Sequence, residues 1–513
     1  MRLNILIGGK AGQGINFVSK IVAGVLSNLG YFTFNYRDYQ SLIRGGHNFN
    51  VLGTSDLPIE SIDSKVELIV ALDEHTLDIH KDNLKKDGII LKGEEFRSEG
   101  KNLNIALSGV LIKILGIPFE ELEKVIAGKF KNSGDAIGAA RKGYDFGKEN
   151  FHLKKLEDKN LKILSGSEAV AIGARGSGLD LYIGYPMTPA TNAFQEMATD
   201  QIADKCMVFQ AENEISAAMM ALGASFSGAK VMTGTSGGGF DLMGESLSFQ
   251  GMSEIPLVVY LASRSGPGSG VPTYTSQADL DVALRSGHGD FPRFVIAPSN
   301  PIENINAVSE SLFLSEKFKT LSILFSDKHL AESEFSSISE PNKPLLYSID
   351  RKIPGDGIVR ASSYESTPDG ISTEDADITK KNADARIKKY NDAKNFIKEN
   401  MEMIKIHGKE DSKNLVIGFG STSGAVKDAI QDLDAKFLQV IYVKPLSDQI
   451  KEEMQKAENI ILVEGNVTGQ LGRLLREKTG ISIKKRILKY DGRPFFTDEL
   501  KAELGVAIKN ERE

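Results

Sequence analysis

The sequence has a single cysteine, Cys206, and no tryptophan among its 513 residues. One cysteine excludes an internal disulfide and any iron–sulfur or zinc site built from the thiolates of this chain alone. The seven histidines are scattered without the spacing of metal ligands. No apolar run reaches the roughly 18 residues of a membrane span, and the first residues, MRLNILIGGKAGQG, lack a signal-peptide cleavage site. We therefore expect a cytoplasmic protein that holds no metal through its own side chains.

Excess positive charge is also absent, because the formal net charge is −7. This balance argues against a nucleic-acid partner and against an anionic membrane surface. The hydrophobic share of 41% and the charged share of 26% are those of a globular protein. A chain of 513 residues is too long for one hydrophobic core, so we expect several domains.

Strand-like apolar runs alternate with helical spacing in three parts of the chain, which predicts an α/β fold of three domains. The first domain, residues 1–155, opens with the strand LNILIGG, a glycine turn and a helix, and FTFNYRDY and VELIVALD are further strands. The second, residues 160–330, has strands that are apolar on both faces, as in buried parallel sheets. Residues 331–411 are polar and predict an exposed connector with surface helices, and residues 412–513 form the third domain.

Two glycine-rich stretches suggest anion sites, and both have a simpler interpretation. GGKAGQG, residues 8–14, lies between a strand and a helix, where backbone amides bind phosphate, but its spacing is neither that of a dinucleotide fold nor that of a P-loop. An anion site and a tight structural turn both fit it. LIRGGHN, residues 42–48, is a basic loop suited to a charged ligand or a partner subunit, and we interpret His47 as structural.

PGDGIV, residues 354–359, is similar to the Gly-Asp-Gly that holds magnesium diphosphate in thiamine-diphosphate enzymes, and Asn382 follows at a matching distance. The preceding residues do not form a buried strand, and Lys381 stands where a second asparagine is expected. We therefore interpret this stretch as a turn in the polar connector.

Two acidic residues, Glu212 and Glu214, precede or begin a helix rich in alanine and glycine, and a TGTSGGG glycine turn follows the next strand. Attraction to the helix dipole is a sufficient explanation for Glu212. Glu214 lies at the N-terminal end of a closely packed helix, beside the glycine turn, and is a candidate functional carboxylate.

Two strands end on residues suited to ligand binding. In LYIGYPMTPATN, residues 181–192, Pro186 and Pro189 flank Thr188 and fix the backbone on both sides of its hydroxyl. Arg264 follows the strand IPLVVYLA. Open α/β sheets bind ligands at the carboxyl ends of their strands, and arginine is suited to a carboxylate or phosphate. Thr188 and Arg264 are therefore candidate ligand contacts.

Read together, these motifs resemble the 2-oxoacid:ferredoxin oxidoreductases, specifically an α subunit with the γ domain fused at its N-terminus. GGKAGQGI and SLIRGGHN look like the γ domain, and YPMTPAT matches Tyr-Pro-Ile-Thr-Pro-Ser with Met187 for Ile and Ala190 for Ser. SRSGPGSGVPT is similar to Arg-Gly-Gly-Pro-Ser-Thr-Gly-x-Pro-Thr, and VEGNVTGQ resembles a Glu-x-Asn-x-x-Gly-Gln segment. The expected domains are thus a γ domain, a pyrimidine-binding thiamine-diphosphate domain and a transketolase-C-terminal-like domain.

The resemblance implies roles for the matching residues. Glu214 is expected to contact N1′ of the thiamine pyrimidine, because sharing a proton there favours the 4′-imino form that activates the thiazolium carbon. Thr188 and Arg264 are expected to bind the 2-oxoacid, with Arg264 on its C1 carboxylate. The other expected cofactor contacts are Tyr185, Pro186, Thr235 and Ser236 for thiamine diphosphate, and Gly12, Gln13 and Gly14 for coenzyme A.

The resemblance also implies partners. A β subunit is expected to supply the diphosphate and Mg²⁺ site and a 4Fe–4S cluster, in an (αβ)₂ heterotetramer that passes electrons to ferredoxin. The expected reaction is the oxidative decarboxylation of a 2-oxoacid with CoA to acyl-CoA and CO₂, with 2-oxoglutarate favoured by the fused architecture. Pyruvate or a branched 2-oxoacid, a ferredoxin-independent transketolase- or dehydrogenase-type thiamine enzyme, and a non-catalytic scaffold remain alternatives. Ala190, Ser265 and Gly268-Ser269 depart from the family pattern and bear on which acid is used.

Overall fold

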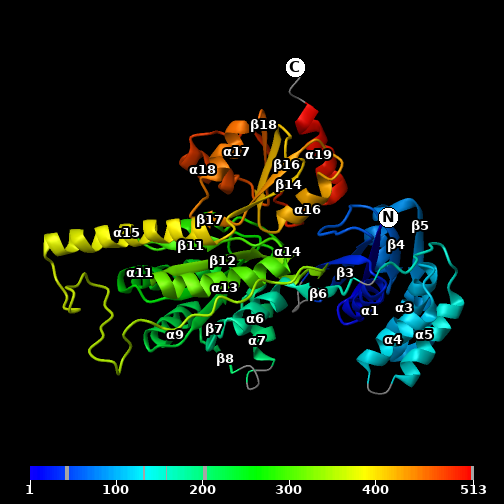
Figure 1. Ribbon diagram of the computed structural model, residues 1–513. Coiled ribbons are helices and arrows are strands. Elements are labelled where there is room, and N and C mark those ends of the chain that lie inside the picture. Colours follow the sequence, from blue (N-terminus) through cyan, green and yellow to red (C-terminus); the bar gives the residue numbers. More distant parts are fainter. Residues whose placement is uncertain (41–44, 131–132, 158, 200, 202–204, 510–513) are drawn as a thin grey trace. The chain divides into compact units, whose positions relative to one another are not determined.

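The computed structural model describes residues 1–40, 45–130, 133–157, 159–199, 201 and 205–509 (Figure 1). Strands and helices alternate along the chain, and the strands form three sheets of seven, seven and five strands. The predicted α/β class is therefore confirmed. The chain forms two compact units: unit 1 comprises residues 1–164, 333–339 and 496–500, and unit 2 comprises the rest. Within the described ranges, no helix is both long and apolar enough to cross a membrane.

Unit 1 is built on a mixed seven-stranded sheet. Its strands are β1 (Arg2–Lys10), β2 (Phe32–Tyr39), β3 (His47–Ser55), β4 (Val66–Ala71), β5 (Leu84–Lys92), β6 (Lys162–Ser165) and β13 (Glu334–Ser337), in the order β5-β4-β1-β3-β2-β13-β6. Its helices are α1 (Ile15–Asn28), α2 (His75–His80), η1 (Lys81–Asn83), η2 (Gly93–Asn102), α3 (Leu103–Ile114), α4 (Phe119–Lys129) and α5 (Gly134–Phe146). The strands predicted from FTFNYRDY and VELIVALD are confirmed as β2 and β4.

The strand β13 comes from the beginning of the segment that the sequence predicts as a connector. It pairs antiparallel with β2, and Glu334 lies opposite Asn35. The Glu334 carboxylate accepts a hydrogen bond from Asn35 Nδ2 at 2.7 Å and another from Arg37. Residues 334–337 therefore belong to the sheet of unit 1, and the short sequence EFSS has no periodicity that would have shown this.

Unit 2 contains a second, almost entirely parallel sheet. Its strands are β7 (Leu181–Gly184), β8 (Met207–Gln210), β9 (Val231–Thr235), β10 (Leu257–Ser263), β11 (Arg293–Ile296), β12 (Leu321–Asp327) and β17 (Tyr442–Lys444), in the order β17-β11-β12-β10-β9-β7-β8. Only the β17–β11 pairing is antiparallel within the described residues. Every residue of β10 and β12 is buried, as the sequence predicts for strands that are apolar on both faces.

Helices cover both faces of this sheet (Figure 1). They are α6 (Gly166–Gly176), α7 (Ala190–Ala198), α9 (Glu214–Phe226), α10 (Gly237–Leu242), α11 (Gly244–Ser253), α12 (Leu280–Arg285), α13 (Pro301–Phe318), α14 (Lys328–Glu332) and α15 (Ala376–Asn400). Val259 packs into a cluster with Leu222 of α9, and its neighbour Tyr260 packs into a second cluster with Val308 of α13. Successive side chains of a strand point to opposite faces, so β10 contributes to two cores.

A third sheet lies near the C-terminus in the same unit. Its strands are β14 (Ile404–Gly408), β15 (Asn414–Phe419), β16 (Lys436–Val440), β18 (Asn459–Glu464) and β19 (Lys485–Leu488), with helices α16 (Thr422–Ala429), α17 (Gln449–Lys456) and α18 (Gln470–Thr479). The last helix, α19 (Thr497–Lys509), begins in unit 1 and belongs to unit 2 from Lys501 on. Ile417 shares one apolar cluster with Val259 of the second sheet. The predicted strand FLQVIYV divides between β16 here and β17 in the second sheet. The two sheets are thus joined by packing and by continuous chain, and the predicted domain boundaries stay predictions.

The stretch PGDGIV lies in the exposed segment before α15 and forms a turn. The backbone N–H of Ile353 donates to the Asp356 carboxylate at 3.2 Å. Asn382, on α15, donates to Glu365 Oε2 at 2.8 Å and to the Ser366 carbonyl at 2.9 Å. The interpretation of PGDGIV as a turn is therefore confirmed, and Asn382 holds the connector against its surface helix.

Candidate active site at the carboxyl ends of the second sheet

The loop that follows β7 carries the predicted ligand residues Tyr185, Pro186 and Thr188. β7 ends at Gly184, and α7 begins at Ala190, directly after Pro189. Tyr185 is 38% exposed. Arg264 Nη1 donates a hydrogen bond to the backbone carbonyl of Thr188 at 2.9 Å. The structure therefore brings Thr188 and Arg264 together, although through the carbonyl of Thr188 and not through the hydroxyl that the sequence singles out.

Arg264 lies half-buried immediately after β10. Burial lowers the pKa of its guanidinium, and the charges of Asp279 and Glu214 oppose that shift. Arginine stays protonated at physiological pH, so the loop of Thr188 faces a fixed positive charge. A fork of N–H donors in this position is suited to a carboxylate ligand.

Glu214 is the first residue of α9. Asn213 caps the helix by accepting the backbone N–H of Ser216 at 2.8 Å. The Glu214 side chain is only 4% exposed, yet none of the described residues donates a hydrogen bond to its carboxylate. A carboxyl group that is this little exposed and accepts no hydrogen bond from the described chain is available to a ligand.

The glycines of TGTSGGG do not form the predicted turn, and that prediction is wrong. Residues 237–239 are the first turn of α10, which begins directly after Ser236. A Cβ atom on Gly239 would lie 2.8 Å from Glu214 Oε1 and would collide with the Thr235 hydroxyl. Glycine is therefore required here because α10 approaches the Glu214 carboxylate closely, and not because the backbone turns.

We expect Gly239→Ala to displace Glu214 and to lower stability. Forcing a methyl group into a packed site typically costs about 1–3 kcal/mol. The neighbouring Gly238 is the matched control, since a Cβ there meets no atom within 4 Å. Thermal unfolding should show a lower melting temperature for Gly239→Ala and little change for Gly238→Ala. Equal melting temperatures for the two variants would contradict the described packing.

Thr235 ends β9, Ser236 follows it as the N-cap of α10, and both residues are fully buried. The Thr235 hydroxyl lies 3.9 Å from the Met187 sulfur, so β9 and the loop after β7 meet here. The Ser236 Oγ is buried without a hydrogen-bond partner among the described residues. Thr235 and Glu214 both lie against Gly239, and the unpartnered hydroxyl of the adjacent Ser236 fits a polar ligand in this region.

Asp279 is a site residue that the sequence analysis missed. Its carboxylate accepts a hydrogen bond from Ser263 Oγ at 2.6 Å and lies against Gly237, where a Cβ would collide with it. Burial raises the pKa of Asp279, while hydrogen bonds from Ser263 and from the backbone of Arg264 lower it. Asp279 thus fixes the end of β10 from which Arg264 extends.

The segment between Arg264 and Asp279 is held by the motif VEGNVTGQ. Gln277 donates its backbone N–H to the Gly465 carbonyl and accepts the Gly465 N–H on Oε1, both at 2.8 Å. Gln470 Nε2 donates to the Ala278 carbonyl at 2.7 Å. Glu464 accepts the N–H groups of Leu471 at 3.0 Å and Gly472 at 2.9 Å, which fixes the start of α18. The motif therefore positions the Arg264–Asp279 loop.

We expect Gln277→Met to destabilise this junction. The side chain is 2% exposed, and its Nε2 also donates to the Phe419 carbonyl at 2.8 Å. Methionine of similar length leaves the Gly465 N–H without its acceptor, at a cost of about 1–3 kcal/mol, and removes one of two hydrogen bonds to the Phe419 carbonyl, which keeps the one from Thr422 Oγ1. Denaturant unfolding should show the loss, whereas Gln195→Met, on the exposed surface of α7, should change little. An unfolding midpoint for Gln277→Met equal to that of the parent would contradict this.

The predicted coenzyme A residues Gly12, Gln13 and Gly14 lie in unit 1, in the turn between β1 and α1. Gln13 Oε1 accepts the Lys10 N–H at 2.7 Å, and Gly14 takes a φ of 82° as the N-cap of α1.

The loop LIRGGHN is described only from Gly45 on, where β3 begins at His47. His47 Nε2 lies 2.9 Å from His80 Nε2 in a buried pair, and burial lowers the pKa of both rings. Residues 42–44 of LIRGGHN lie outside the described residues.

Family models match two parts of the chain. Residues 172–403 match "Pyruvate flavodoxin/ferredoxin oxidoreductase, thiamine diP-bdg", and residues 4–101 match "Pyruvate ferredoxin/flavodoxin oxidoreductase". The first range contains Thr188, Glu214 and Arg264.

Curated relatives extend this similarity to the full length. The chain is 30% identical to "2-oxoacid:ferredoxin oxidoreductase subunit alpha" of a Sulfolobus species, over 99% of this chain and 98% of the relative. It is 27% identical to "2-oxoglutarate oxidoreductase subunit KorA" of Mycobacterium tuberculosis, over 77% and 67%. A solved 2-oxoglutarate:ferredoxin oxidoreductase from Magnetococcus marinus, with 2-oxoglutarate, coenzyme A and succinyl-CoA bound, has the same fold, with a TM-score of 0.89, 24% identity and coverage of 99% and 100%.

Proposed function

Since the chain belongs to the 2-oxoacid:ferredoxin oxidoreductase α-subunit family, an oxidoreductase family, we propose that it forms the pyrimidine-binding half of a thiamine-diphosphate active site that a β subunit completes. The single observation that carries this proposal is the Glu214 carboxylate, which is buried beside Gly239 without a hydrogen-bond donor in the described chain. N1′ of an aminopyrimidine is the type of group that can share a proton with it.

The residues of this chain have separate roles at that site. Glu214 holds the proton shared with N1′, and Thr235 and Ser236 line the buried space next to it. Arg264 binds the C1 carboxylate of the 2-oxoacid while its Nη1 holds the Thr188 carbonyl, so the acid is oriented against the loop after β7. Bound thiamine diphosphate supplies the nucleophilic carbon and the electron sink that decarboxylation of a 2-oxoacid requires.

The substrate and the partners form the finer part of the proposal. Relatives named for 2-oxoglutarate support that acid, with succinyl-CoA as the product and coenzyme A held in part by Gly12, Gln13 and Gly14. Mg²⁺ and the 4Fe–4S cluster belong to the β subunit, in an (αβ)₂ assembly located in the cytoplasm. Ferredoxin accepts the two electrons released for each acid oxidised.

Co-purification with the β subunit tests this function. The complex should show iron–sulfur absorption and should reduce a viologen dye only when a 2-oxoacid and CoA are both present, with 2-oxoglutarate used better than pyruvate. Turnover by the 513-residue chain alone would contradict the proposal. A complex without iron–sulfur absorption would favour the ferredoxin-independent thiamine enzymes instead.

A further inference from the structure

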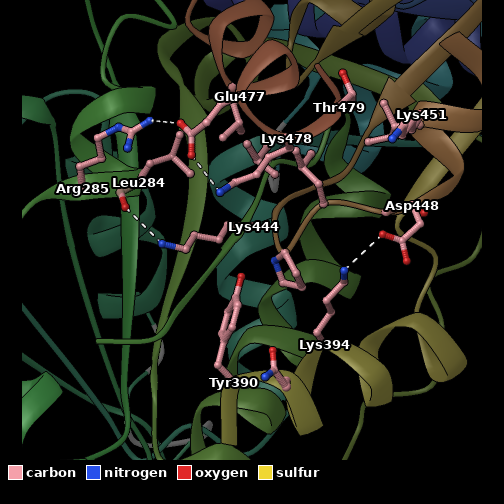
Figure 2. A pocket seen from close by; sticks show the side chains of 17 residues that line it. Leu284, Arg285, Tyr390, Lys394, Lys444, Asp448, Lys451, Glu477, Lys478 and Thr479 are labelled. Carbon is pink, nitrogen blue, oxygen red and sulfur yellow. Dashed lines mark hydrogen bonds and ion pairs between the residues drawn. The ribbon is translucent and has the colours of Figure 1, made fainter. Parts of the chain in front are cut away.

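A second site of unit 2 is a cavity of about 540 Å³ between the C-terminal part of α15, β17 and the helices α17 and α18 (Figure 2). This volume is typical of small-molecule sites. Its lining includes six apolar residues: Leu284, Val443, Pro445, Leu446, Ile450 and Leu474. The ring of Tyr390 borders the same space, and Figure 2 shows Lys444 pointing towards the Leu284 carbonyl, near Lys478 and Arg285, while Lys394 points towards Asp448.

Positive charge dominates the lining. Five basic residues, Arg285, Lys394, Lys444, Lys451 and Lys478, face two acidic ones, Asp448 and Glu477. Each carboxylate is already shared between two cations. Glu477 contacts Arg285 at 2.8 Å and Lys478 at 2.9 Å, and Asp448 contacts Lys394 at 3.2 Å and Lys398 at 3.4 Å. The cavity therefore holds more positive charge than its own acids neutralise.

Lys444 is the cation of this lining whose positive charge is least neutralised by neighbouring groups. Its Nζ lies 3.5 Å from the Leu284 carbonyl, at the limit of a hydrogen bond, and it has no carboxylate partner among the described residues. Burial, together with the charges of Arg293, Lys478 and Arg285, lowers the pKa of Lys444 to about 8, and the charge of Glu477 opposes this shift. Lys394, Lys451, Asp448 and the phenol of Tyr390 complete the titratable groups around the cavity. An anion bound in the cavity would offset the repulsion among these positive charges.

The cavity is remote from the site of Glu214. β17 and β9 are four steps apart in the sheet order β17-β11-β12-β10-β9, which separates them by about 19 Å at the usual strand spacing. A ligand bound here does not reach the groups that act on the 2-oxoacid.

We propose that this cavity binds a nucleotide-sized anion with two or more phosphate groups. The phosphates lie by Lys444, Lys478 and Arg285, and a ring-bearing body packs against Tyr390 and the apolar lining residues. Ammonium groups bind phosphate as point charges, and a flat ring next to an aromatic side chain gains stacking energy. This inference is independent of the reaction proposed above.

Isothermal titration calorimetry of the full-length chain with ADP tests the proposal. ADP should bind with a dissociation constant below about 1 mM, more tightly than inorganic pyrophosphate, and adenosine should not bind. At pH 8 binding should take up on the order of half a proton, because the anion raises the pKa of Lys444 from about 8. Titrations in HEPES and in Tris reveal this proton through the buffer ionisation heat, and the affinity should fall as the pH rises above 8.

Three variants make the test specific. Lys444→Met should weaken ADP binding by about 10-fold to 100-fold, the value of one charge-assisted contact. Lys444→Arg should keep the binding and lose the proton uptake, since arginine does not titrate. Lys484→Met, an exposed lysine before β19, should bind like the parent. The proposal is overturned if ADP does not bind, if Lys444→Met binds as the parent does, or if Lys444→Arg still takes up the proton; thermal melting confirms that each variant is folded.

Discussion

Replacing Glu214 by glutamine should lower kcat of the complex with the β subunit by roughly 10²–10⁴, the usual effect of losing a proton-transfer group. Glutamine fills the same buried space beside Gly239 but cannot hold the shared proton. Stability should change little, because no hydrogen bond within the described chain depends on the carboxylate. Viologen reduction with saturating 2-oxoacid and CoA measures kcat.

The matched control for this variant is Glu212→Gln. Glu212 lies two residues earlier and is exposed, so only its weak attraction to the helix dipole is lost. A Glu214→Gln complex as active as Glu212→Gln would favour the non-catalytic scaffold, and the buried carboxylate would then need another explanation.

The second large effect is expected at Arg264. Arg264→Met should lower kcat/KM for the 2-oxoacid by about 10-fold to 150-fold, which corresponds to the 1.5–3 kcal/mol of a hydrogen bond to a charged group. The variant also releases the Thr188 carbonyl, which Nη1 holds at 2.9 Å. Arg264→Lys should recover only part of the loss, since an ammonium group does not provide two parallel donors.

Steady-state kinetics separates this role from a general loss of structure. The KM for the 2-oxoacid should rise, while the KM for CoA should stay near that of the parent. Arg476→Met, on the exposed face of α18, is the control. Equal increases in both KM values would show that Arg264 supports the fold of the loop and does not bind the acid.

The sequence identifies site residues that lie in a local motif at the end of a strand much better than site residues whose role depends on contacts with distant parts of the chain. Glu214, Thr188 and Arg264 were identifiable because each adjoins a short, recognisable motif at the end of a strand or the start of a helix. Local pattern also predicted the α/β class, and the interpretation of PGDGIV as a turn is confirmed by its exposed backbone.

Asp279 and Gln277 were not identifiable in this way, because their importance comes from tertiary contacts. Gln277 meets Gly465 across 188 residues of sequence, and nothing in the stretch TSQADLD indicates that contact. The glycines of TGTSGGG were assigned to a turn because glycine usually provides backbone freedom, whereas Gly239 instead makes room for Glu214 and Thr235. The same limit applies to the cavity at Lys444, whose walls come from four separate stretches of the chain.

The most direct test of the central claim follows the proton that Glu214 is proposed to hold. In the complex with the β subunit, the C2 proton of bound thiamine diphosphate should exchange with deuterium rapidly in the parent protein, as measured by quenched-flow NMR. The Glu214→Gln complex should bind the cofactor but exchange this proton roughly 10²–10⁴ times more slowly. An exchange rate in Glu214→Gln equal to that of the parent would contradict the account.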